Sequence, residues 1–279
     1  MAALVSAAGA GAKGSAEAQA AAFFRKRLLF LAAAVAAFLA LNAVCAAYVD
    51  YSFIDTLVQV PAGVAWLIVE FAPSAASLEK LGVILPALGS TMLVSVAASC
   101  VAAVLAFALA VMGSRSVGLG GPLPLLARGI ASLFRNIPVV AWTFVLLFSF
   151  KQSEFTGFLA LLFTSFGYLV RCFLETVDEA ASGPVEALRA VGASYPQIIA
   201  QAVIPLTITQ VISWVLYMIE TNIRDATLVG ILTGTGIGFV FDVYYKSFRY
   251  DVAGLVILTV IIVVIACEMT SNFVRRRML

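Results

Sequence analysis

The sequence contains no histidine. Histidine is the commonest general base, the usual partner of a catalytic nucleophile and the commonest metal ligand in proteins. Its absence excludes membrane enzymes that depend on one. The chain also lacks a Gly-x-x-x-x-Gly-Lys-[Ser/Thr] run, so it does not hold ATP phosphates in a P-loop. We therefore expect no catalytic residue, no metal site and no cofactor in this chain.

Charge is scarce as well. Only 11% of the residues are charged, against about a quarter in soluble domains, and a net charge of +2 is too small to indicate nucleic-acid binding. The four cysteines lie in or beside apolar runs without a CxxC pair; they are Cys45, Cys100, Cys172 and Cys267. This favours buried thiols that pack as small hydrophobes over disulfides or a metal site.

Apolar residues are abundant, at 63% of the 279 residues. A soluble fold of this size cannot bury so much apolar surface, so membrane lipid must surround much of the chain. Six runs are long enough, or can be extended enough, to cross about 30 Å of hydrocarbon. They are Leu28–Val49, Leu81–Ser114, Asn136–Phe150, Phe155–Val170, Ala190–Ile219 and Val252–Val274. The prediction is an all-α integral membrane protein with about six transmembrane helices.

Two further apolar segments are poor candidates for a crossing. Thr56–Val69 contains Pro61 and Gly63, and its length suits an interfacial or external helix. Ala226–Phe241 carries four glycines, which are poor helix formers. Non-helical backbone at membrane depth survives only where protein covers it or it lines a cavity, so we expect a Gly-rich re-entrant or external segment there.

The division of the chain follows from these runs. Residues 1–24 are rich in Ala, Gly and Ser and predict a disordered cytoplasmic tail. Residues 25–80 hold the first span and an external segment, residues 81–275 form the membrane core, and residues 276–279 make a basic cytoplasmic end.

The distribution of basic residues sets the expected orientation. With six spans and both termini inside, only five basic residues fall on the outer side, namely Lys80, Lys151, Arg224, Lys246 and Arg249. The remainder, including Arg25–Arg27 and Arg275–Arg277, fall on the cytoplasmic side, as the positive-inside rule requires. We expect a multi-pass protein of the inner or plasma membrane with both termini in the cytoplasm.

The longest cytoplasmic loop, from about Glu175 to Pro205, predicts a helix–Gly–helix elbow. A helix is expected to start at Ser182-Gly183-Pro184, with Pro184 in its permissive first turn, and to end at Gly192. Ser194 can cap a second short helix. An apolar stripe made by Val185, Leu188 and Val191 needs a partner.

The spacing in this loop resembles the EAA loop of ABC importer permeases, the element that docks into the nucleotide-binding subunit. Glu186, Ala187, Gly192 and Pro205 match that pattern in register. Three positions depart from it by one apolar residue for another: Leu188, Ala202 and Ile204. The resemblance covers roughly Leu81–Val274 and, more weakly, the first span.

Within that family the chain is most similar to phosphonate-type permeases. Arg135-Asn136-Ile137-Pro138 resembles their Arg-x-Ile-Pro element. Glu220–Arg224, followed by Gly230 and Gly234–Gly238, resembles their Asn-Ile-Arg and Gly-rich segment, with Thr235 where glycine is common. The resemblance implies a permease for phosphonate or a related small oxyanion.

It also implies partners. A transporter without its own P-loop must take ATP hydrolysis from a separate subunit, so the expected complex has two permease copies, two ATP-binding ABC subunits on the EAA loops and an extracytoplasmic substrate-binding protein. A homodimer is expected because six spans enclose too little for a pathway. The expected mechanism is alternating access, with the elbows moving the spans as rigid bodies.

Candidate pathway residues lie on and after the fifth span. Asn222 and Arg224 could attract an oxyanion near its outer end, but Glu220 and Arg224 are also spaced to pair with each other. Thr207, Gln210 and Ser213 form a polar stripe that either lines the pathway or bonds neighbouring helices. Gly234, Gly236 and Gly238 favour a tight-packing or gating turn over a phosphate cradle, since no P-loop lysine follows.

Other functions compete with this interpretation. A methionine- or amino-acid-type ABC permease shares the Gly-rich segment. A secondary transporter is expected to carry mid-span ionisable residues and an internal repeat, neither of which the sequence indicates. A membrane enzyme is disfavoured by the missing histidine and the lack of paired intramembrane carboxylates.

Overall fold

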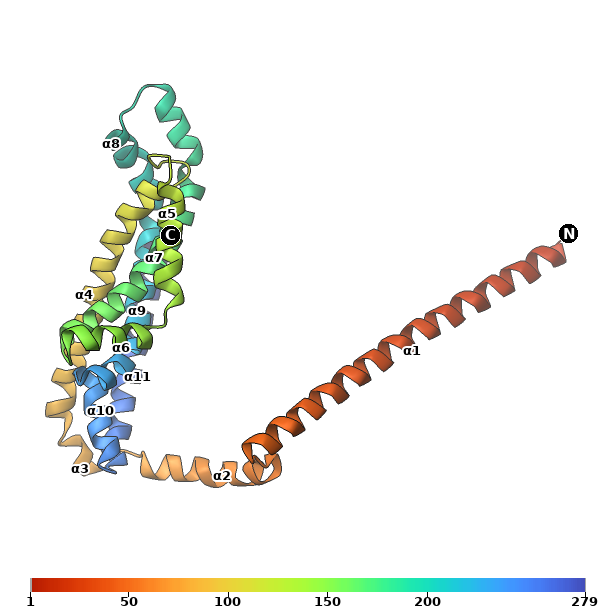
Figure 1. The fold of residues 1–279 in the computed structure, drawn as a ribbon, viewed down its shortest axis with the longest axis horizontal. Coiled ribbons are helices and arrows are strands. Elements are labelled where there is room, and N and C mark those ends of the chain that lie inside the picture. The colour runs from red at the N-terminus through yellow and green to blue at the C-terminus, as the bar shows by residue number, and fades with distance from the viewer. Residues whose placement is uncertain (1, 279) are drawn as a thin grey trace. The chain divides into compact units, whose positions relative to one another are not determined.

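The computed structural model describes the backbone of residues 2–278 and the side chains within that range except those of 2–22, 181, 182 and 278. Every regular element in the described range is a helix (Figure 1). The helices are α1 (Ala2–Val49), α2 (Phe53–Glu70), α3 (Ala75–Leu78), α4 (Leu81–Gly113), α5 (Leu123–Asn136), α6 (Val139–Phe150), α7 (Glu154–Ala190), α8 (Tyr195–Ile198), the π-helix η1 (Ile199–Val203), α9 (Ile204–Thr233), α10 (Gly236–Lys246) and α11 (Tyr250–Met278). The predicted all-α membrane fold is confirmed.

The chain divides into two compact units, Met1–Leu67 and Ile68–Leu279. The first unit contains α1 and most of α2, joined by a turn at Asp50, which has a φ of 55°. The helix α1 includes residues 2–22, for which the sequence predicts a disordered tail. Alanine is the strongest helix former, and this segment is rich in it. Met1 of that tail and Leu279 of the basic end lie outside the described residues.

The second unit is a bundle in which α4, α7 and α9 run side by side (Figure 1). Its core depends on small residues: Ala98, Ala102, Ala106 and Ala110 recur every fourth residue of α4 and are fully buried. Small residues let helix backbones approach closely in membranes. They pack here with large α7 side chains such as Phe173. In Figure 1, α8 lies at one end of this bundle, while α3 and α10 lie at the other.

In the part of the chain that the structure describes, six helices are long and apolar enough to cross a membrane, and the bent pair α5–α6 could make a seventh span. Six is the predicted number, but these six helices are not all the predicted ones. α2 qualifies by length and composition, although the sequence favours an external helix there. The span predicted at Asn136–Phe150 is instead half of a pair, α5 and α6, that bends by 90°. Pro138 explains the bend, because it drives Ile137 into the extended region at φ −92°, ψ 118°.

The Gly-rich segment is more helical than the sequence predicts. Residues 226–233 continue α9, and residues 236–241 belong to α10, so only Gly234 and Thr235 interrupt the helices. Gly234 ends α9 in the left-handed conformation at φ 67°. Gly238 permits close packing, because a Cβ there would lie 2.0 Å from the carbonyl oxygen of Thr227.

Candidate functional site

The first arm of the elbow is the C-terminal part of the long helix α7. α7 runs without interruption from Glu154 to Ala190 and contains Pro184 in its interior, so the predicted helix start at Ser182 is wrong. The predicted break at Gly192 is present. Its φ is 79°, and the Ala193 N–H donates to the Leu188 carbonyl oxygen at 3.0 Å. Glycine is the residue that tolerates this conformation at a helix end.

The second arm starts where the sequence predicts. Ser194 is the N-cap of α8, and Gln197 accepts the Ser194 backbone N–H at 2.8 Å in a capping box. Pro196 occupies the first turn of α8, and Pro205 occupies the first turn of α9. Between them lies η1, a π-helical turn that the sequence analysis did not find.

The three residues of the predicted apolar stripe, Val185, Leu188 and Val191, differ in burial. Val185 is 1% exposed and packs with Val117 and Ile198, while Leu188 is partly buried against the same cluster. Val191, predicted on the same stripe, is 79% exposed. The elbow therefore presents a second, exposed face around Val191, which includes Glu186, Ala187 and Gly192. Pro205, at the start of α9, is exposed as well.

Asp178 is a residue of this region that sequence reasoning missed. Its Oδ1 accepts the Ser114 hydroxyl at 2.6 Å and the Arg115 backbone N–H at 2.7 Å, and its Oδ2 accepts Nη2 of Arg128 at 2.9 Å. One carboxylate on α7 thus binds the loop after α4 and also binds α5. No local pattern signals this role, because these partners lie 50 to 64 residues away in sequence.

Asn222 and Arg224 do not form one site. The Asn222 side chain is fully buried, and its Nδ2 donates to Ser99 of α4 at 2.8 Å and to Ser165 of α7 at 2.7 Å. Arg224 is 47% exposed and pairs with Glu220 at 2.8 Å, the ion pair that its spacing allows. Asn222 therefore lies in the helix core rather than at an open outer end, and it joins three helices.

The three residues of the predicted polar stripe on α9, Thr207, Gln210 and Ser213, do not share one role. The hydroxyl of Thr207 donates to the Val203 carbonyl oxygen, and that of Ser213 to the Thr209 carbonyl oxygen, so both bond their own helix. Gln210 instead is exposed and lines a groove of about 410 Å³ between α7 and α9, together with Glu175 and Trp214. Of the three, only Gln210 faces an open space.

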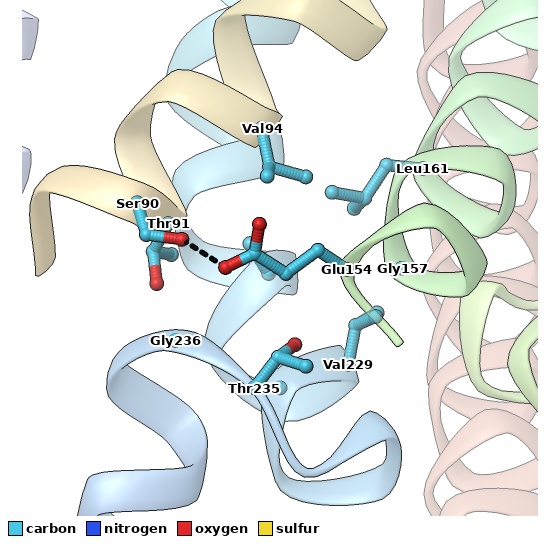
Figure 2. Close-up of a pocket in the computed structure, with 11 residues that line it drawn as sticks. Ser90, Thr91, Val94, Glu154, Gly157, Leu161, Val229, Thr235 and Gly236 are labelled. Carbon is cyan, nitrogen blue, oxygen red and sulfur yellow. Dashed lines mark hydrogen bonds between the residues drawn. The ribbon is translucent and has the colours of Figure 1, made fainter. Parts of the chain in front are cut away.

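The glycine turn encloses a small pocket against α4 and α7 (Figure 2). The Thr91 hydroxyl accepts the Ile237 N–H at 2.9 Å, and a Cβ on Gly236 would lie 2.3 Å from that hydroxyl oxygen. Glu154 accepts the Ser90 hydroxyl at 2.7 Å, the contact drawn in Figure 2. The pocket volume of about 20 Å³ is that of a single water site. In this conformation the turn packs helices, and a role of Gly234, Gly236 and Gly238 in the pathway stays a prediction.

Comparison with known proteins gives the following matches. The family model described as the binding-protein-dependent transport system inner membrane component matches residues 102–277. The phosphate-import permease protein PhnE of Mycolicibacterium smegmatis is 26% identical over 201 residues, covering 72% of this chain and 38% of the relative. This chain therefore spans well under half the length of that protein.

A second relative is the PhnE2 protein of Escherichia coli K12, named for a cryptic phosphonate transport system permease. It is 31% identical over 118 residues, covering 42% of this chain and 97% of the relative. Among solved structures, an inward-facing form of the MetNI methionine ABC transporter matches with a TM-score of 0.65 at 17% identity, covering 74% of this chain and 99% of that one. That likeness concerns the fold.

Proposed function

Since the chain belongs to the family of binding-protein-dependent transport system inner membrane components, we propose that it is the permease subunit of an ATP-driven importer for a small phosphorus oxyanion, phosphonate foremost. Two copies would form the translocation pathway. Two ATP-binding subunits and an extracytoplasmic substrate-binding protein would complete the complex. The chain itself would carry out no bond chemistry.

The observation that carries this proposal is the open face of the elbow. Glu186, Ala187 and Val191 are exposed, while Val185, their neighbour, is packed into the chain's own core. This face lies where the EAA resemblance expects the ATP-binding subunit to dock, and it supports a cytoplasmic position for the α8 end of the bundle.

The substrate class is supported by the relatives. One is named for phosphate import and another for phosphonate transport, and both substrates are small anions with phosphoryl oxygens. The Asn222-Ile223-Arg224 element points the same way by resemblance. Gln210, which faces the groove between α7 and α9, is the residue we propose for the pathway surface.

The proposed mechanism is alternating access. ATP binding closes the two ATP-binding subunits and draws the paired elbows together. α7 would carry that displacement into the bundle, because it runs unbroken from Glu154 in the bundle to Ala190 in the first arm of the elbow, and packed helices move as rigid bodies. The outer face would then open to receive an anion from the binding protein.

Docking is tested by a substitution at the elbow turn. Gly192→Trp adds a large side chain where φ is 79°, and we expect it to abolish co-purification of the ATP-binding subunit. Gly82→Trp, where nothing lies within 4 Å of an added Cβ, is the control at the start of α4. Unaltered complex formation by Gly192→Trp would show that the docking assignment is wrong.

Substrate class is tested by growth and uptake. A deletion strain without a redundant system should fail to grow on a phosphonate as the sole phosphorus source, and the wild-type chain should restore growth. Methionine uptake, measured in the same strains, should be unaffected. Normal growth on phosphonate, together with loss of methionine uptake, would indicate a methionine-type permease instead.

The energy source is tested in the same strains. Phosphonate uptake that continues after ATP depletion but stops when an uncoupler is added would indicate a secondary transporter.

A further inference from the structure

A short loop at the end of α4 is built around the carboxylate of Asp178. Besides the Ser114 hydroxyl and the Arg115 N–H, the Ser116 N–H donates to Oδ1 at 3.3 Å. Ser114 in turn accepts the Val117 N–H through its hydroxyl oxygen at 3.1 Å. Val117 is fully buried in the cluster beneath the elbow. Asp178 therefore organises the loop as well as contacting it.

The second carboxylate oxygen reaches a different helix. Its partner, Arg128, belongs to α5, and the side chains of Asp178 and Arg128 are 22% and 26% exposed. Hydrogen bonds between charged groups are shorter and stronger than neutral ones, and partial burial shields this one from solvent. The α4 end, α5 and α7 are thus joined at one charged group.

This group lies close to the elbow along the same helix. Asp178 and Glu186 are both on α7 with no break between them, and the helix rise places them about 12 Å apart along the axis. A second link runs back from the elbow, where Nη2 of Arg189 donates to the Val117 carbonyl oxygen at 3.3 Å. The elbow and the Asp178 group hold the same loop from two sides.

On the basis of the proposed function, we infer that Asp178 is the positioning residue that couples the elbow to the rest of the bundle. Apolar packing is non-directional. Directed bonds from one carboxylate to α5 and to the α4 loop add a fixed register to that packing. A displacement of the elbow is then delivered to α4, α5 and α7 together, and the α5–α6 bend moves with it.

The test uses Asp178→Asn in the complete transporter, reconstituted in vesicles with its ATP-binding subunit and binding protein. Asparagine has the shape of aspartate and keeps one acceptor oxygen, but it removes the charge and directs an NH2 group at donors. We expect the number of phosphonate molecules imported per ATP hydrolysed to fall about tenfold, as the loss of a charged hydrogen bond predicts. Co-purification of the ATP-binding subunit and basal ATP hydrolysis should persist.

The matched control is Asp242→Asn. It makes the same substitution at an aspartate whose ion-pair partner, Lys246, lies on the same helix, α10, and it should leave the import ratio unchanged. Arg128→Gln should lower the ratio, and combining it with Asp178→Asn should add little, because the two residues share one interaction.

The possible outcomes distinguish a failure of this inference from a failure of the proposed function on which it rests. A wild-type import ratio in Asp178→Asn overturns the inference. Loss of the ATP-binding subunit from that variant also overturns it, since Asp178 would then serve docking. A wild-type chain that binds no ATP-binding subunit overturns the proposed function instead, and this is seen before any variant is made.

Discussion

At the scale of single residues, the amide of Asn222 joins three helices. It is fully buried and donates to one serine of α4 and one of α7. The Ser95 hydroxyl donates to the backbone carbonyl oxygen of the same residue at 3.2 Å. Within the membrane, bonds of this kind hold helices that have no hydrophobic reason to prefer each other over lipid. Asn222 therefore fixes the register of α9 against its neighbours.

Removing the side-chain amide of Asn222 should therefore lower the stability of the protein. Asn222→Leu deletes both side-chain donors, and we expect the free energy of unfolding to fall by about 1–2 kcal/mol. The measurement is the thermal unfolding midpoint of the purified protein in detergent. Asn272→Leu, at an exposed position of α11, should leave the midpoint in place. If Asn222→Leu leaves the unfolding midpoint unchanged but raises the KM for uptake, Asn222 acts in the translocation pathway and not in holding the helices together.

At the scale of elements, the bend between α5 and α6 depends on a glycine of α7. A Cβ on Gly167 would lie 2.5 Å from the Arg135 backbone nitrogen and 2.7 Å from the Phe134 Cβ. Trp142 folds back over the bend, its Nε1 donating to the Phe134 carbonyl oxygen at 3.3 Å. Proline creates the bend, and Gly167 lets α7 lie against it.

Gly167→Ala should push the bend away from α7. Overpacking of this kind costs about 1–3 kcal/mol, because the obstructing atoms include backbone, which cannot rotate aside. Thermal unfolding in detergent measures the loss. Gly129→Ala, on α5 where nothing lies within 4 Å of an added Cβ, should be neutral or slightly stabilising. Equal midpoints for the two variants would contradict the close approach.

The same elements show how far sequence reasoning reaches. Gly192 and Ser194 were predictable because a left-handed glycine and a serine cap depend on their immediate neighbours. Asp178 was not, since its partners come from α5 and from the loop after α4. The start of the elbow helix was predicted too late because Pro184 looks like a first-turn residue, whereas α7 packing carries the helix through it. Local sequence patterns therefore predict where a helix can end, and packing against distant residues determines whether it ends there.

At the scale of the whole molecule, orientation depends on whether α2 crosses the membrane. Its length and composition permit a crossing, but Pro61 and Gly63 favour a position at the interface. We expect an external α2 and both termini in the cytoplasm, as the basic residues require.

Reporter fusions test this arrangement. A fluorescent protein that matures only in the cytoplasm, fused to either end of the chain, should fluoresce in both cases. Whole-cell fluorescence, normalised to the amount of fusion protein, is the measurement. A dark N-terminal fusion beside a bright C-terminal one would place α2 across the bilayer, and two dark fusions would invert the whole topology.

The π-helix η1 has a consequence for how this chain tolerates change in length. In η1 the Ile204 N–H donates to the Ile199 carbonyl oxygen, five residues back, so this turn contains one residue more than an α-helical turn. Pro205 follows it and has no N–H to restore the regular pattern. Each helical residue advances the direction of a side chain by about 100°. A single-residue deletion within η1 would therefore leave an ordinary α-helical turn, and the elbow and α9 would keep their directions. The same deletion in the regular part of α9 would instead turn the residues on one side of it by about 100° relative to those on the other.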